Sequence, residues 1–178
     1  MSKSHGHYSI RYAGLSEGSH EFIFDVHEDF FKDYYPETEI LGADIKLQIR
    51  AEKSPSMLML ELIFSGNISV ECDRCLDPCT VPVSAVQKLI FTASDDRMQN
   101  GKIDDTMIAI SPESDSVMLD EYVYDFILLS LPLRRVHDEN EGTDSACNQE
   151  MLERINTLQN EKKTDPRWEK LNQIKYVN

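Results

Sequence analysis

The sequence is poor in the features that mark several specialised classes of protein. It holds 7 glycines and 7 prolines among 178 residues, too few for a collagen-like or low-complexity chain. Its apolar runs are short, whereas a membrane-spanning helix needs about 20 apolar residues. The N-terminus lacks the apolar core of a secretory signal, so we expect a cytoplasmic protein without membrane attachment. The length predicts a single domain over residues 1–178, and a hydrophobic content of 40% is enough for a core.

Familiar catalytic motifs are missing as well. The chain has no GxxxxGK[ST] phosphate loop, no GxGxxG, no GxSxG elbow and no HExxH. It carries 32 acidic residues, but their spacing does not select any two as a general acid and base. We therefore predict that the protein is not an enzyme, and no small-molecule substrate is evident.

Basic residues are scarce, with 18 Lys and Arg against 32 Asp and Glu, which gives a net charge of −14. Residues 95–150 hold 14 acidic and 4 basic residues, whereas residues 151–178 hold 4 acidic and 6 basic residues. This balance argues against a nucleic-acid binder coated with basic charge. The acidic block is either a solvated surface or a docking surface for a cationic partner.

One basic cluster lies near the C-terminus and includes the single tryptophan. These side chains could contact RNA through charge and base stacking, or the tryptophan could pack on the core with the lysines exposed. The candidate residues are Lys162, Lys163, Arg167, Trp168 and Lys170.

Alternating apolar residues predict antiparallel strands in the first half of the chain. Ala43–Lys53 and Met57–Ser65 alternate on either side of a Ser-Pro-Ser turn, which predicts a hairpin. Further strands are expected over 8–15 and 20–26, with turn residues between them, and over 81–92 and 107–110.

Helical spacing appears mainly later in the chain. We predict helices over 27–35 and 120–131, the latter capped by Asp120, and a third helix whose apolar stripe is Cys147, Met151, Ile155 and Leu158. This order predicts an α+β fold, an antiparallel sheet or partial β-barrel with helices packed against it and a helical C-terminal third. The expected subdivisions are a flexible segment 1–7, a mobile acidic loop at about 94–105 and a helical segment at about 145–172.

The most specific local feature is a Cys-x-x-Cys pair, Cys72 and Cys75. Two thiols with this spacing at a turn can hold one zinc ion if two further ligands complete a tetrahedron. Cys147 and His137 are the other candidates outside the N-terminus. Cys79 could also contribute, although we expect Pro78 and the strand beyond it to turn the thiol away. The hypothesis is a structural zinc site. Reduced cysteines without metal, a redox pair and a catalytic zinc are the alternatives.

The order of these motifs resembles that of the YceD family. The resemblance runs from about residue 10 to residue 172 and rests on Cys72-x-x-Cys75 followed by Leu-Asp-Pro, on the helix ending in Leu-Ser-Leu-Pro, on His137-Asp138, on Cys147, and on the terminal Asp-Pro-Arg-Trp-Glu-Lys-Leu run. Many members carry further Cys-x-x-Cys pairs in the tail, where this chain has only His137 and Cys147.

The resemblance implies a role in accumulation, processing or stability of the large-subunit ribosomal RNA. The implied partners are a basic large-subunit ribosomal protein, the precursor of large-subunit ribosomal RNA, or both. We expect a non-enzymatic ribosome-biogenesis factor that docks such a protein on its acidic surface. The alternatives are an RNA-binding module that uses the basic C-terminal cluster and a zinc-stapled interaction domain of another pathway.

Overall fold

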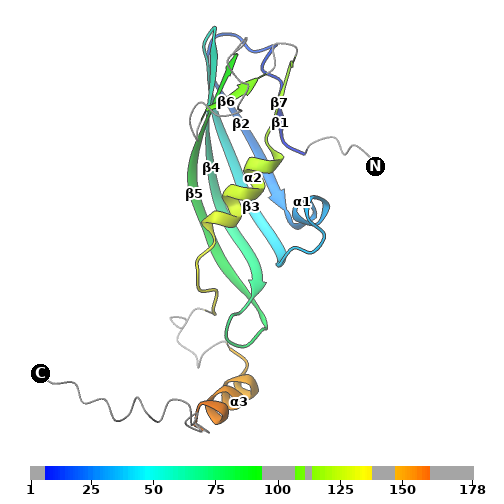
Figure 1. Ribbon diagram of the computed structural model, residues 1–178, viewed down its shortest axis with the longest axis vertical. Coiled ribbons are helices and arrows are strands. Elements are labelled where there is room, and N and C mark those ends of the chain that lie inside the picture. Colours follow the sequence, from blue (N-terminus) through cyan, green and yellow to red (C-terminus); the bar gives the residue numbers. More distant parts are fainter. Residues whose placement is uncertain (1–6, 94–106, 111–113, 138–146, 161–178) are drawn as a thin grey trace, which may run out of the picture.

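The computed structural model describes residues 7–93, 107–110, 114–137 and 147–160, which form a mixed α+β fold (Figure 1). A five-stranded, mostly antiparallel sheet contains β2 (Gly18–His27), β3 (Ile40–Lys53), β4 (Met57–Glu71), β5 (Pro78–Ala93) and β6 (Met107–Ile110), in that order. The predicted fold class is confirmed. The expected loop 94–105, the first six residues of the expected flexible terminus and the part of the expected helical segment after residue 160 lie outside the described residues.

The hairpin of β3 and β4 forms because both strands bury every second residue. Ile45, Leu47 and Ile49 on β3 are buried, and the even-numbered residues from Leu58 to Phe64 are buried on β4. The two strands pair antiparallel from Lys53 and Leu58 onward, which confirms the predicted hairpin. β5 continues this pattern and pairs with β4 along its length, so one face of the sheet is apolar and buried.

Helices cover that apolar face. α1 (Glu28–Tyr34) buries Phe30 and Phe31, and α2 (Asp120–Ser130) lies across the sheet in Figure 1 with Val123 and Ile127 buried. α3 (Gln149–Asn160) lies beyond the end of the sheet, next to the turn between β4 and β5. These helices match their predicted positions, except that Cys147 precedes α3, which begins only at Gln149.

Two expectations about the N-terminal region are wrong. The strand expected over 8–15 is only β1 (Ser9–Ile10), which pairs with β7 (Val117–Met118), whereas β2 pairs with β3. The residue at the N-cap of α2 is Leu119, and Asp120 makes no cap. Its carboxylate instead accepts hydrogen bonds from the backbone N–H groups of His7 (3.0 Å) and Tyr8 (2.7 Å). Local sequence signals cannot reveal these partners, which lie more than 100 residues away.

Candidate metal centre

Four soft ligand atoms meet at the end of the sheet near α3. They are the Sγ atoms of Cys72, Cys75 and Cys147 and a ring nitrogen of His137, and all lie within 4.8 Å of one another. The three cysteines are buried and unpaired by disulfides, and His137 is half-buried. Of the predicted metal ligands, the structure therefore brings all four together.

The first two ligands lie in the tight turn between β4 and β5. The N–H of Cys72 donates to the carbonyl of Asp77 (3.0 Å), and the N–H of Leu76 donates to the carbonyl of Cys72 (2.9 Å). Leu76 takes the left-handed backbone conformation with φ of 65°, which lets the chain reverse within this short span. These two hydrogen bonds close the turn, so the Sγ atoms of Cys72 and Cys75 lie in the same cluster.

The other two ligands come from the segments on either side of residues 138–146. The backbone around Arg135 holds the first segment against the turn. The N–H of Asp73 donates to the Arg135 carbonyl (2.7 Å), and the N–H of Arg135 donates to the Asp73 carboxylate (2.6 Å). His137 follows two residues later and reaches the thiols. On the other side, Asn148 accepts hydrogen bonds from N–H groups of the first turn of α3, and Cys147 directly precedes this cap.

The spacing of the ligand atoms fits a tetrahedral zinc ion. Zinc bound to sulfur and nitrogen places neighbouring ligand atoms about 3.6 to 3.8 Å apart. The distance is 3.9 Å from Cys72 Sγ to Cys147 Sγ, and 3.6 and 3.5 Å from His137 Nδ1 to the sulfurs of Cys75 and Cys147. The donor set of three thiols and one imidazole is one that structural zinc sites use.

The second ring nitrogen of His137 fixes its tautomer. Nε2 lies 3.1 Å from the carbonyl oxygen of Pro78, and a carbonyl can only accept a hydrogen bond. Nε2 therefore carries the proton, and Nδ1 presents its lone pair to the sulfurs of Cys75 and Cys147. An outer hydrogen bond of this kind is typical of histidines that bind metals.

The environment prepares one of the thiols for metal binding. Burial alone would raise the pKa of Cys72, but hydrogen bonds from the backbone N–H groups of Cys75, Arg74 and His137 outweigh it and lower the pKa to about 6. Burial and the neighbouring thiols raise the pKa of Cys147 to about 11. A bound cation favours the thiolate form of every cysteine it touches, so metal binding releases protons.

Predictions for residues other than the four ligands compare with the structure as follows. Cys79 is buried on β5 and is not one of the four clustered ligands, but its thiol hydrogen-bonds with that of Cys72, so the expectation that it points away is wrong. The contact between Asp73 and Arg135 was missed, because a separation of 62 residues leaves no local signal. The predicted RNA-contact residues, Lys162, Lys163, Arg167, Trp168 and Lys170, lie outside the described residues. Among the described helices, none is long and apolar enough to span a membrane.

Comparison with known families identifies the chain. The family model described as "Large ribosomal RNA subunit accumulation protein YceD" matches residues 60–175, which is 116 of 178 residues and includes all four ligands of the candidate centre. Neither a curated protein nor a solved structure matches the chain. Since the family model covers more than half of the chain, this protein belongs to the YceD family.

Proposed function

We propose that this chain is a non-enzymatic factor that supports accumulation of the large-subunit ribosomal RNA by docking a basic ribosomal protein. The observation that carries the proposal is membership of the YceD family, which implies a role in large-subunit RNA accumulation. The family is one of ribosome assembly factors and is not known for enzymes. We place the work of this protein in the cytoplasm, where ribosomal subunits are assembled.

Charge supports a protein partner over direct contact with RNA. A net charge of −14 repels phosphate, whereas it steers a cationic ribosomal protein toward the surface. Described carboxylates of the acidic block include Asp120, Glu121 and Asp125 on α2. The competing function is RNA binding through the basic C-terminal cluster, which predicts an affinity for RNA that falls steeply with salt.

A structural zinc is the second part of the proposal. The support for it is a closed set of four protein ligands, with three buried thiols and an oriented imidazole. When bound, zinc supplies a cross-link. The residues of this chain do the rest: the turn presents Cys72 and Cys75, Arg135 holds the His137 segment in place, and Cys147 ties α3 to the sheet.

The test is deletion of the gene in its host, followed by measurement of the ratio of large-subunit to small-subunit ribosomal RNA. We expect the ratio to fall and to recover when the intact gene is restored. An unchanged ratio would contradict the proposed function.

Pull-downs at physiological salt separate the two mechanisms, since recovery of ribosomal RNA without any ribosomal protein would contradict the docking mechanism. Turnover of RNA by the purified chain would contradict a non-enzymatic role.

A further inference from the structure

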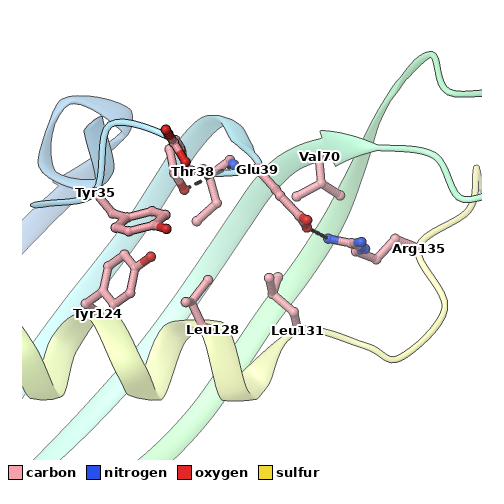
Figure 2. Close-up of a pocket in the computed structure, with 10 residues that line it drawn as sticks. Tyr35, Thr38, Glu39, Val70, Tyr124, Leu128, Leu131 and Arg135 are labelled. Atoms are coloured by element: carbon pink, nitrogen blue, oxygen red, sulfur yellow. Dashed lines mark hydrogen bonds and ion pairs between the residues drawn. The ribbon is translucent and has the colours of Figure 1, made fainter. Parts of the chain in front are cut away.

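A groove runs between α2 and the segment that joins α1 to β3 (Figure 2). Its volume is about 340 Å³. Leu128 of α2 and Leu131, which directly follows this helix, point into it, and Val70 of β4 lies opposite them. The floor of the groove is therefore apolar.

One end of the groove is aromatic. Tyr35, which follows α1, and Tyr124 of α2 face each other across the opening in Figure 2. Tyr35 is 51% exposed, and the neighbouring Tyr34 stacks on Tyr124 with ring centroids 4.8 Å apart. Exposed tyrosine rings offer faces that attract cations, together with hydroxyl groups for hydrogen bonds.

The rims of the groove carry negative charge. Glu37 and Glu39 line the groove from the segment between α1 and β3. Glu121 and Asp125 are exposed on α2, outside the lining but on the helix that forms the other side of the groove. The two carboxylates on α2 also act on the aromatic end of the groove. The pKa of Tyr34 is raised, first by burial and then by the negative charges of Glu121 and Asp125. Glu37 in the groove and two carboxylates on α2 thus lie around an apolar and aromatic groove, while Glu39 is paired with Arg135.

The cation that lines the groove is already neutralised. Arg135 closes the end opposite the tyrosines and pairs with Glu39 at 2.9 Å and Asp73 at 3.5 Å. Asp73 belongs to the turn that holds Cys72 and Cys75. The candidate metal centre therefore fixes one end of the groove, and the groove remains negative over the rest of its length.

From these features we propose that the groove binds a protein segment rich in arginine and lysine. The hydrocarbon stems of the segment pack on Leu128 and Leu131, and its cationic groups stack on Tyr35 and Tyr124. Its remaining charges pair with the carboxylates of Glu37, Glu121 and Asp125. This inference rests on the proposed function, because it assigns the docking of a basic partner to one place on the chain.

The experiment titrates the full-length chain into a fluorescein-labelled peptide of alternating leucine and arginine, and follows fluorescence anisotropy. The counterpart peptide of alternating leucine and glutamine measures the contribution of apolar contact alone. We expect the arginine peptide to bind and the glutamine peptide to bind at least about tenfold more weakly.

Matched variants locate the site. The double variant Glu121→Gln with Asp125→Asn should weaken binding about fivefold, because it removes the two negative charges of α2 beside the groove. The double variant Asp44→Asn with Glu52→Gln changes the net charge equally, but both residues are exposed on the opposite face of the sheet, so it should bind like the unaltered chain. Tyr35→Ala should weaken binding about threefold, and Tyr35→Phe, which keeps the ring, should not.

Three outcomes would overturn the inference. The first is an equal loss in both double variants, which would show binding to net charge alone. The second is preferential binding of single-stranded RNA that is lost with the groove variants. The third is full restoration of the RNA ratio in deletion cells by a groove variant that has lost the peptide. That last result would leave the proposed function intact, whereas an unchanged RNA ratio on deletion would remove the function and leave peptide binding standing.

Discussion

At the residue scale, the two ring nitrogens of His137 have different roles, one as a hydrogen-bond donor and the other as a lone-pair donor. Nε2 donates to the carbonyl of Pro78 and Nδ1 faces the sulfurs of Cys75 and Cys147. The lone pair of Nδ1 is thus directed at two thiols, which is the orientation that an imidazole ligand of a shared metal ion takes. The geometry therefore leads to a test of metal content in the purified chain.

Elemental analysis of untagged protein, purified without chelator, should find about one zinc per chain. Cys147→Ala removes one ligand and should reduce the zinc content to background. Cys79→Ala is the matched control, because Cys79 is also a buried thiol near the centre but not a ligand, and this variant should keep its zinc. Zinc retained by Cys147→Ala, or none in the unaltered chain, would refute the site.

Tyr8 gives the fold a dependence on alkaline pH. Burial raises its pKa to about 12 from 10.0, with Asp120 and Asp25 adding to the shift. The protonated phenol is thus favoured by folding, and this contribution is fully present below pH 10. It is lost as the pH rises from 10 to 12, because the unfolded chain releases the proton first.

Chemical denaturation across this range should show the effect. The free energy of unfolding of the unaltered chain should fall by about 2 kcal/mol more than that of Tyr8→Phe, which has no phenol to titrate. Parallel curves for the two chains would mean that another group causes the alkaline loss.

At the scale of elements, β4 depends on Gly66 for its place in the centre of the sheet. Gly66 has φ of 159°, and an added Cβ would stand 2.6 Å from Cα of Ile45 and closer still to the Asp44 carbonyl. Both contacts are with the backbone of β3, which cannot rotate away. At Gly42, by contrast, an added Cβ meets only the Cβ of Ser69 at 3.5 Å, an ordinary contact.

Gly66→Ala should therefore destabilise the protein by about 3 kcal/mol, and Gly42→Ala should change its stability by less than about 1 kcal/mol. Thermal unfolding followed by circular dichroism compares them directly. Equal midpoints for the two variants would show that β3 and β4 do not approach as closely as the structure shows.

The elements also show how far the sequence could predict this fold. The β3–β4 hairpin and α2 were predictable, because apolar residues repeat every second position in the strands and at helical spacing in α2. The pairing of β1 with β7 and the parallel pairing of β6 with β5 were not, since only distant contacts select these partners. At the centre, ligand chemistry identified the four candidates, but the Asp73–Arg135 contact that aligns them has no signature in the sequence.

At the scale of the whole molecule, the centre joins α3 to the sheet. α3 packs on the core through the partly buried Met151 and Leu152, whereas Leu158 is 72% exposed, so the ligand cluster beside Cys147 supplements a small apolar contact. If zinc is bound there, its removal should release α3 while the core of the sheet, which buries its own residues, stays folded.

Hydrogen exchange with and without a strong chelator, under reducing conditions, tests this coupling. Amides of α3 should exchange much faster after chelation, and amides in the centre of β3 and β4 should keep their protection. The Cys79→Ala chain should respond like the unaltered one. Loss of protection throughout the sheet would mean that the metal supports the entire fold, and no change in α3 would mean that it does not anchor this helix.

Because Cys72 and Cys147 are 75 residues apart, the ligands of the centre are added to the growing chain at different times during synthesis. At about 5–20 residues per second, Cys147 is added about 4 to 15 s after Cys72. During that interval β3, β4 and β5 can already pair, since each follows its neighbour along the chain. The nascent chain then holds two thiols at a finished turn and awaits the other two ligands. Metal capture would thus mark the moment at which translation has passed Cys147.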